Sequence, residues 1–435
     1  MSQIPEIEFR STQEIRAAQE DRLQQLMAYV AQHSPFYRRL FATHGIDAGG
    51  IRRLEDLVRL PRTAKDDLQQ YNWDFLCVPR HAIAEYTSTS GTLGKPVTLA
   101  LTAADRTRLA YNEYISFCCA DGTPHDTYQL MLTLDRQFMA GIAYYEGIRQ
   151  LGAAVVRVGP GLPAMQWETI ERIRPTVLVG VPSFVVKLLE YAQAHGIDPA
   201  KTSVKKIICI GESLRTASFE LGVIGQKIRN GWDVAVYSTY ASTEMQTAFT
   251  ECRAGQGGHH HPELLIVEIL DEAGQPVPDG TPGEVTITTL GVEGMPLVRY
   301  RTGDLAAAHT ARCLCGRTTL RLGPIVGRLQ QMIKLKGTTV YPPGVFELLN
   351  QVPAVQDYVV EAITGALGTD ELRLHVLVKE TQQEETMLRL PAMFQSTLRV
   401  VPEIRFVTTV ELEQLQFGKL DRKVRRFLDR RNGQG

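Results

Sequence analysis

Glycine, hydroxyl and lysine side chains are concentrated in one short stretch of the sequence, residues 86–96 (YTSTSGTLGKP). Glycine lets backbone N–H groups approach a ligand closely, hydroxyl groups add further donors, and a lysine supplies a positive charge. Residues of these types in this order predict an anion-binding loop, with a phosphate chain as its ligand. The residues expected to bind the phosphates are Ser88, Thr89, Ser90, Gly91, Thr92, Gly94 and Lys95.

The loop differs from the Walker A motif, a common phosphate-binding loop. Fewer residues separate Gly91 from Gly94 than that motif has between its glycines, and Pro96 stands where the motif has Ser or Thr. Pro96 has no N–H, and the residues after it (VTLALT) are typical of a strand. We therefore expect the loop to join two β-strands. A polar hairpin without a ligand is the alternative.

Two later segments carry side chains that suit a nucleotide. Residues 240–244 (YASTE) follow an apolar run. The ring of Tyr240 suits a purine, and Glu244 beside a polyphosphate would need a divalent cation between them. Residues 300–304 (YRTGD) end in Asp304, whose ionised carboxylate can accept two hydrogen bonds at once. Taken alone, Glu244 could also be a solvated or helix-capping carboxylate, and Asp304 a β-turn residue.

Sulfur and imidazole side chains predict a metal site. The candidate ligands are Cys252, Cys313, Cys315 and one histidine of the run at residues 258–261 (GHHH). Three thiolates and one imidazole match a closed, tetrahedral structural zinc site. His259 is the preferred fourth ligand, His261 would project to the same side of a strand, and His260 also stays open. Free surface thiols are the alternative to a metal site.

The elements expected to position these side chains are those of an α/β protein with a mostly parallel sheet. Short apolar runs between residues 127 and 238 alternate with helical patterns, which indicates a sheet covered on both faces. The helical patterns cover residues 141–150, 165–174, 182–195 and 213–229. Ligands of such sheets gather at the carboxyl ends of the strands. Gly211, Glu212 and Ser213 directly follow one predicted strand.

Two changes of pattern divide the chain. After residue 262 the helices give way to β-hairpins, which predict a hairpin subdomain. A small α+β pattern, which includes a final basic helix, begins after Arg328. We expect a large domain at residues 1–327, with a helical lead-in at 1–80 and the candidate ligand-binding segments in 81–327, and a small mobile domain at 328–435.

Composition narrows the possible partners and surroundings. The 435 residues carry a net charge of −1, which gives no electrostatic reason for a nucleic acid or an anionic membrane as partner. A signal segment and an apolar run of membrane-spanning length are not recognisable, so we expect a cytoplasmic protein. Cys77, Cys118, Cys119 and Cys209 have apolar neighbours and are predicted to be reduced, buried thiols. A homodimer is the commonest assembly of such proteins.

The motifs together resemble those of the adenylate-forming superfamily of acyl-CoA synthetases. Residues 86–96 resemble its phosphate loop, residues 240–244 resemble its YGxTE segment, and residues 300–304 match its ribose motif. Two longer segments, residues 57–68 (LVRLPRTAKDDL) and 288–304 (TTLGVEGMPLVRYRTGD), resemble the phenylacetate–CoA ligases specifically. The resemblance covers essentially the whole chain, with the motifs in the family's order.

The resemblance implies a role for each nucleotide-binding side chain. Tyr240 would stack on adenine, Thr243 would contact the α-phosphate and Glu244 would hold Mg²⁺. Asp304 would accept hydrogen bonds from the two ribose hydroxyls. Residues 211–213 match the turn that lies beside the adenine.

The resemblance extends to the small domain. Residues 327–337 (GRLQQMIKLKG) fall at the family's hinge between the two domains. The resemblance implies that Arg328 binds ATP, and Gln330 stands where the family has an acidic hinge residue. Residues 417–422 (FGKLDR) resemble the motif that carries the adenylation lysine, which would be Lys419. A further lysine on a basic helix is the alternative interpretation.

The activity that the resemblance implies is that of an ATP-dependent acyl-CoA ligase. A small carboxylic acid would react with MgATP to give an acyl adenylate, and coenzyme A would then displace AMP. The residues expected to face the acyl group are Phe138, Ala140, Gly141, Pro182 and Phe184. Aromatic and small residues suit an arylacetate such as phenylacetate, and equally other small apolar acids. An enzyme that loads a carrier-protein thiol and a non-catalytic nucleotide-binding protein remain alternatives.

Overall fold

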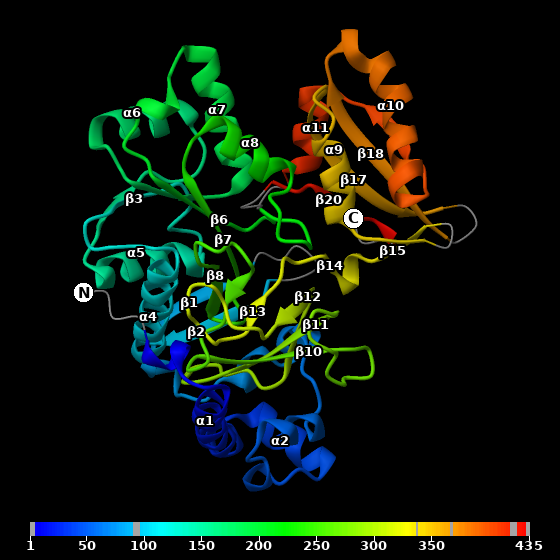
Figure 1. The fold of residues 1–435 in the computed structure, drawn as a ribbon. Coiled ribbons are helices and arrows are strands. Elements are labelled where there is room, and N and C mark those ends of the chain that lie inside the picture. The colour runs from blue at the N-terminus through cyan, green and yellow to red at the C-terminus, as the bar shows by residue number, and fades with distance from the viewer. Residues whose placement is uncertain (1–4, 90–95, 336–337, 366–368, 418–423, 432–435) are drawn as a thin grey trace. The chain divides into compact units, whose positions relative to one another are not determined.

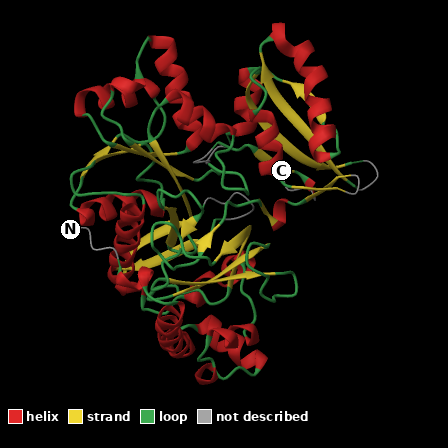
Figure 2. Cartoon of the chain, in the orientation of Figure 1, coloured by secondary structure: helices red, strands yellow, loops and turns green. Residues whose placement is uncertain are grey.

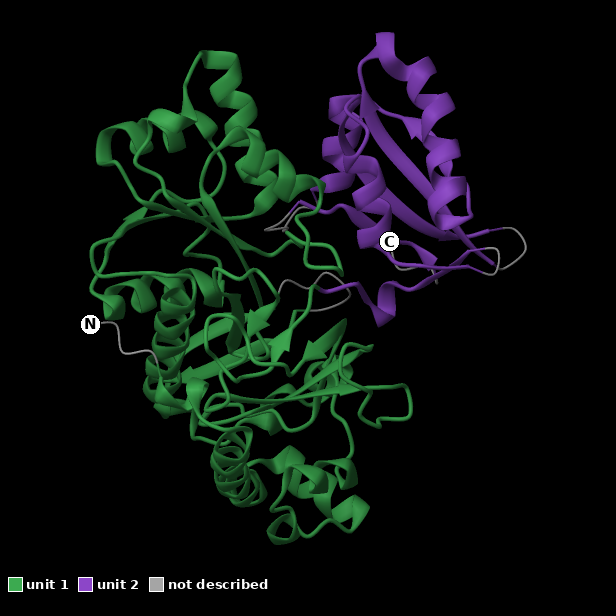
Figure 3. Cartoon of the chain, viewed as in Figure 1, with its two compact units in different colours: residues 1–324 green, residues 325–435 purple. Residues whose placement is uncertain are grey.

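The computed structural model describes residues 5–89, 96–335, 338–365, 369–417 and 424–431. The chain divides into two compact units, Met1–Pro324 and Ile325–Gly435 (Figure 3). The boundary expected from the sequence, at Gly327 and Arg328, lies close to this division. The described helices include none that is both long and apolar enough to span a membrane.

The first unit begins with two α-helices that meet at Ser34. Its hydroxyl accepts a hydrogen bond from the Tyr37 backbone N–H, and Pro35 occupies the first turn of the second helix, so the chain is directed into a new helix at this point. These helices are α1 (Thr12–His33) and α2 (Pro35–His44). The other elements of the lead-in are η1 (Glu6–Phe9), η2 (Ala48–Gly50), η3 (Leu54–Arg59), α3 (Lys65–Tyr71), η4 (Asn72–Phe75) and η5 (Arg80–Ala82).

The predicted phosphate loop joins two antiparallel strands, as the sequence indicated. These strands are β1 (Ile83–Ser88) and β2 (Thr98–Thr102), and Ser88 pairs with Thr98 at the end next to the loop. Helix α4 (Ala103–Cys119) follows directly, capped by the Thr102 hydroxyl and by Asp105.

A parallel half-sheet forms one end of the large sheet of the first unit (Figure 1). Its strands, in spatial order, are β4 (Ala154–Arg157), β3 (Thr127–Leu130), β5 (Val177–Gly180), β6 (Lys206–Ile210) and β7 (Ala235–Ser242). The helices between them are α5 (Met139–Leu151), α6 (Pro163–Ile173), α7 (Pro182–His195) and α8 (Val223–Gly231), with η6 (Pro199–Lys201).

Side chains of this half-sheet alternate between two cores. Leu178, Ile207 and Cys209 pack in one cluster with residues of α6, α7 and α8. Val179 and Ile208 pack in the other cluster with residues of α4 and α5. Helices therefore cover both faces, which confirms the prediction made from the apolar runs (Figure 2).

The helix predicted at residues 213–229 is wrong in its first part. Helix α8 begins only at Val223, and the residues before it form a loop closed by a bridge between Arg215 and Leu221. The Thr216 hydroxyl approaches the Glu220 carbonyl oxygen at 3.4 Å, and the Arg215 guanidinium pairs with Glu251 on another strand at 2.7 Å. Such local and tertiary hydrogen bonds compete with helical ones.

An antiparallel half continues the same sheet beyond β7. In spatial order its strands are β8 (Thr247–Glu251), β9 (Gly258–His259), β13 (Arg321–Leu322), β12 (Tyr300–His309), β11 (Pro282–Thr289) and β10 (Leu265–Leu270). The predicted hairpins are present, but the pairing of β7 with β8 makes them part of one mixed sheet.

The second unit is an α+β fold around a sheet of order β19-β18-β17-β20. Its strands are β17 (Val355–Thr364), β18 (Asp370–Val378), β19 (Glu403–Phe406) and β20 (Phe427–Asp429), and β15 (Ile333–Leu335) and β16 (Thr338–Val340) form a separate hairpin. The remaining elements are α9 (Pro342–Asn350), α10 (Glu380–Leu398), α11 (Thr409–Gln416), β14 (Gly327–Arg328) and η7 (Leu329–Gln331).

The final basic helix expected from the sequence is wrong for the described end of the chain. Residues 427–429 form β20, which runs parallel to β17. The basic side chains that follow find acidic partners on neighbouring strands: Arg430 pairs with Glu361 at 3.0 Å and Arg431 with Asp370 at 2.8 Å. Pairing of this kind stabilises a strand at the edge of a sheet.

Candidate active site

The loops after β6 and β7 lie side by side, because the two strands are parallel and Ile210 pairs with Thr239. Gly211 has a φ of +77°, a conformation that glycine adopts without strain. The Glu212 carboxylate accepts hydrogen bonds from the backbone N–H and the hydroxyl of Ser183, at 3.0 and 2.9 Å. The segment expected beside adenine, residues 211–213, is thus fixed to the first turn of α7 through Glu212.

Thr243 and Glu244 lie half-buried in the turn between β7 and β8. The guanidinium of Arg108, on α4, holds this turn by donating to the Gln246 carbonyl oxygen at 2.7 Å and to the Thr247 hydroxyl at 3.1 Å. Arg108 is buried, and burial lowers its pKa to about 10. Arg108 was not among the residues predicted to belong to the site. A charged side chain on the otherwise mostly apolar face of a helix could have indicated a buried, paired arginine.

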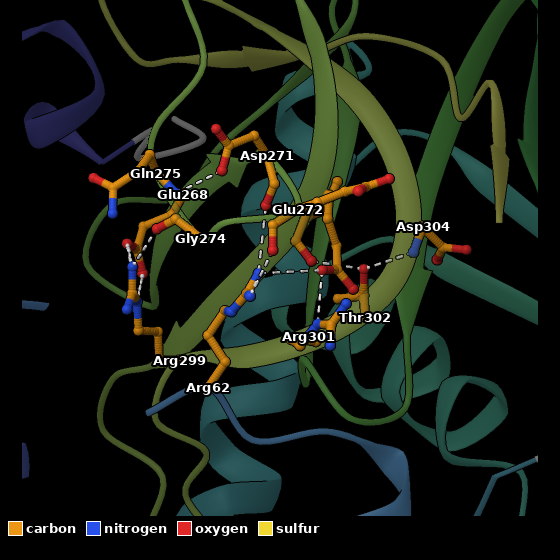
Figure 4. Close-up of polar contacts among 12 residues, drawn as sticks. Arg62, Glu268, Asp271, Glu272, Gly274, Gln275, Arg299, Arg301, Thr302 and Asp304 are labelled. Carbon is orange, nitrogen blue, oxygen red and sulfur yellow. Dashed lines mark hydrogen bonds and ion pairs between the residues drawn. The ribbon is translucent and has the colours of Figure 1, made fainter. Parts of the chain in front are cut away.

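Tyr240 and Asp304, expected at the adenine and the ribose, are in direct contact. The Tyr240 hydroxyl donates to Asp304 Oδ2 at 2.7 Å. The Asp304 backbone N–H donates to the Thr302 hydroxyl at 3.1 Å, so the Asp304 backbone is also fixed (Figure 4). Burial, and then the charges of Glu244 and Asp304, raise the pKa of the Tyr300 phenol. Both carboxylates therefore lie near one ring, as a common nucleotide site requires.

The strand that carries Asp304 is anchored to the lead-in segment. The Thr63 backbone N–H donates to the Arg299 carbonyl oxygen at 3.1 Å, and the Arg301 N–H donates to the Thr63 carbonyl oxygen at 2.8 Å. The two segments that resemble phenylacetate–CoA ligases, residues 57–68 and 288–304, are therefore hydrogen-bonded to each other.

Two arginines, buried Arg299 and partly exposed Arg301, complete this anchor (Figure 4). Arg299 pairs with Glu268 at 3.2 Å and donates to the Gly274 carbonyl oxygen at 3.0 Å. Arg301 pairs with Glu284 at 2.7 Å. Burial raises the pKa of Glu268, and Arg299 opposes that shift. These pairs could not be read from the sequence, because each joins residues of different elements.

Only part of the predicted phosphate loop is described. The Thr89 N–H donates to the Val97 carbonyl oxygen and its hydroxyl accepts from the Val97 N–H, both at 3.0 Å, so the ends of the loop are held together. Ser88 and Thr89 are buried. Ser90, Gly91, Thr92, Gly94 and Lys95 lie outside the described residues, as does Lys419. In the second unit, Arg328 lies in β14, and the Gln330 carbonyl oxygen accepts from Arg431 at 3.4 Å.

The residues expected at the acyl group begin helices α5 and α7. Phe138 caps α5 and packs with Ala140 against the core around α4 and α5. A Cβ on Gly141 would lie 2.3 Å from the Thr133 carbonyl oxygen, so the close approach of α5 to that backbone explains this glycine. Pro182 begins α7, and Phe184 packs against the core on the other face. That these residues face the acyl group stays a prediction.

The four residues predicted to bind zinc converge. The candidate ligand atoms of Cys252, His259, Cys313 and Cys315 all lie within 4.8 Å of one another. The Cys252 and Cys313 sulfurs are 3.6 Å apart, and the Cys315 sulfur is 3.4 Å from His259 Nε2. Tetrahedral zinc with thiolate bonds of normal length separates two sulfurs by about 3.8 Å. This donor set therefore fits zinc in both type and spacing.

Neighbouring hydrogen bonds distinguish the three histidines. His259 Nδ1 lies 3.1 Å from the Thr319 hydroxyl, which directs Nε2 toward the cluster. His260 Nε2 is 2.6 Å from the Leu265 carbonyl oxygen, and His261 Nδ1 is 2.7 Å from Glu8. Burial acts to raise the pKa of the Cys315 thiol, but hydrogen bonds with His259 and Arg317 outweigh it and lower the pKa to about 5. Cys77, Cys118, Cys119 and Cys209 are buried free thiols, as predicted.

Comparison with known proteins identifies the family. Residues 53–294 match the family of AMP-binding enzymes. The chain is 33% identical to the phenylacetate-coenzyme A ligase of Thermus thermophilus, over 98% of this chain and 99% of the relative. This chain belongs to the phenylacetate–CoA ligase family. The corresponding ligase of Escherichia coli is 26% identical over 87% of this chain and 86% of its own length.

The solved structures agree with this assignment. A 2-hydroxyisobutyryl-CoA ligase in the postadenylation state, in complex with R3-HIB-AMP, superposes with a TM-score of 0.84 and 26% identity, over 98% of this chain and 91% of that chain. The protein is thus an ATP-dependent, AMP-forming acyl-CoA ligase that acts through an acyl adenylate. Its substrates are a carboxylic acid, ATP and coenzyme A.

We expect Arg299→Met to destabilise the first unit, because the buried Glu268 carboxylate would lose its partner. Loss of one member of a buried ion pair costs about 3–5 kcal/mol. Urea unfolding followed by tryptophan fluorescence measures this, since Trp73, Trp167 and Trp232 all lie in the first unit. The matched control is Arg39→Met, which breaks an exposed pair with Asp74. An equal, small loss in both variants would contradict the anchor.

Proposed function

We propose that this ligase activates a small aryl carboxylate such as phenylacetate. The observation that carries the proposal is the near full-length match to a phenylacetate-coenzyme A ligase at 33% identity. The aromatic ring of Phe138 and the small residues after it are consistent with a flat, apolar acyl group. A short 2-hydroxy acid is the second candidate, because the 2-hydroxyisobutyryl-CoA ligase superposes closely.

The proposed roles of the site residues follow from their chemistry. Tyr240 packs on adenine and orients Asp304, which accepts hydrogen bonds from the ribose. Thr243 and the hydroxyls and backbone of the phosphate loop contact the phosphates. Glu244 would hold Mg²⁺, which offsets the negative charge of the phosphates. Lys419 is proposed to bridge the carboxylate and the α-phosphate during adenylation.

The reaction consists of two half-reactions, adenylation of the acid and transfer of the acyl group to coenzyme A, and neither changes an oxidation state. A carboxylate oxygen attacks the α-phosphorus of ATP, the bond to the β-phosphate oxygen breaks, and pyrophosphate leaves. The thiolate of coenzyme A then attacks the acyl carbon, and AMP leaves with the electron pair of the cleaved C–O bond. The first step converts a poor acyl donor into a good one, and this is why ATP is consumed.

Pyrophosphate release with a panel of acids tests the substrate class. We expect phenylacetate and similar arylacetates to give the highest kcat/KM, with short 2-hydroxy acids lower, because an apolar pocket favours the larger apolar group. Parallel assays with free coenzyme A and with a carrier protein identify the thiol acceptor. Preference for a 2-hydroxy acid would replace the aryl proposal, and the absence of pyrophosphate release with every acid would contradict adenylation.

We expect Tyr240→Phe to weaken ATP binding, because Asp304 loses the donor that orients its carboxylate. Loss of one hydrogen bond to this buried carboxylate should raise the KM for ATP by about three- to tenfold. The matched control is Tyr237→Phe on the same strand, whose hydroxyl donates to Asp121 at 3.0 Å. Equal effects of the two substitutions on the KM for ATP would count against the role of Tyr240.

We also propose that Cys252, His259, Cys313 and Cys315 bind a structural zinc ion. The support is the convergence of three thiols and one imidazole nitrogen at spacings that suit a tetrahedral site. When bound, zinc would link the segment after β8, strand β9 and the loop before β13. Its role would be structural, since all four positions are taken by protein.

Metal analysis tests this proposal directly. The purified protein should contain about one zinc per chain. Cys313→Ser and Cys315→Ser should each lose most of it and lower the thermal midpoint. Cys77→Ser is the control, because Cys77 is also a buried free thiol but lies outside the cluster. Zinc-free protein after purification under zinc-replete conditions would remove the proposal.

A further inference from the structure

The short N-terminal helix η1 buries a carboxylate. Glu8 is 0% exposed, whereas its neighbours Glu6 and Phe9 are exposed. Its two oxygens have different partners: Oε1 lies 2.7 Å from His261 Nδ1, and Oε2 accepts from Arg317 Nε at 2.5 Å. A buried carboxylate is costly unless it is paired and hydrogen-bonded, so Glu8 is a specific connection between η1 and the chain around residue 317.

Arg317 extends this connection to a proposed zinc ligand. Its guanidinium is buried and donates from Nη1 to the Cys315 sulfur at 3.5 Å. The ring of Phe9 lies 5.3 Å from the guanidinium carbon. The Thr318 backbone N–H also donates to the Glu8 carbonyl oxygen at 2.9 Å. Helix η1 therefore contacts the segment that supplies Cys315 through both side chains and backbone.

The other partner of Glu8, His261, also contacts Ser116, but the burial of all three side chains excludes a catalytic triad. His261 Nε2 lies 3.1 Å from the Ser116 hydroxyl, so Ser116, His261 and Glu8 have the spacing of a nucleophile, a base and an orienting acid. Ser116 is 2% exposed, and His261 and Glu8 are 0% exposed. A substrate could not reach the hydroxyl. These contacts serve instead to fix the chain two residues after His259.

We propose that Glu8 and Arg317 form the outer shell of the zinc site, so that zinc binding and the docking of η1 stabilise each other. This inference rests on the zinc site proposed above. Three thiolates around Zn²⁺ leave a net negative charge, and the guanidinium beside Cys315 offsets it. Glu8 positions that guanidinium. Because binding couplings are reciprocal, removal of zinc must weaken the docking of η1 by the same factor by which undocking of η1 weakens zinc binding.

Zinc affinity of Glu8→Gln, measured by competition with a chromophoric chelator, tests the first half of the proposal. Outer-shell partners typically contribute about 10- to 100-fold to metal affinity, and we expect a loss in that range. Glu6→Gln is the matched control, because it makes the same chemical change on the same helix at an exposed pair with Arg10. Wild-type affinity in Glu8→Gln would overturn the proposal, as would an equal loss in Glu6→Gln.

Hydrogen exchange of the wild-type protein tests the second half and needs no variant to fold. We expect chelation of zinc to speed exchange of the Thr318 amide, which donates to Glu8, and of the amides of η1. Exchange in helix α6 is the internal reference and should stay the same. Unchanged exchange at Thr318 and η1 in protein that has lost its zinc would overturn the coupling. Protein that never takes up zinc would instead overturn the zinc site itself.

Discussion

The antiparallel pairing of β7 with β8 is the constraint on which the arrangement of the site depends. Strand β7 belongs to the parallel half of the sheet, and the turn after it reverses the chain into the antiparallel half. That turn carries Thr243 and Glu244, while the antiparallel half brings Asp304 to Tyr240. A shift of one residue in the pairing of Ser242 with Thr247 would turn these side chains to the opposite face.

Buried arginines hold the segments around this hairpin at fixed positions. Arg108 donates to carbonyl and hydroxyl oxygens, Arg299 to a carboxylate and carbonyl oxygens, and Arg317 to a carboxylate and a thiol. Moving a charge out of water costs several kcal/mol, so such residues contribute little net stability compared with apolar side chains of similar size. These arginines instead determine the positions of chain segments, because one planar guanidinium can donate hydrogen bonds to several segments that are distant in the sequence.

The sequence predicted those features that depend on residue type and local order. The strand–loop–strand unit around residues 86–96 and the Cys/His cluster could both be found because few other structures use those residues in that order. The loop at 213–222 was predicted as helix because its competing contact, Arg215 with Glu251, joins different elements. Glu8 could not be recognised for the same reason, since its partner is 309 positions away.

The short distance between Gly141 and the backbone at Thr133 has a consequence for protein engineering. Under the proposed assignment of Phe138 to the acyl site, the start of α5 is the place to alter acyl preference, and substitutions at Phe138 and Ala140 change side chains that already pack in a partly buried layer. Gly141 should not be substituted, because a side chain there would collide with the backbone at Thr133 and push α5 away from it. Libraries aimed at new substrates should therefore vary the first positions of α5 and leave this glycine unchanged.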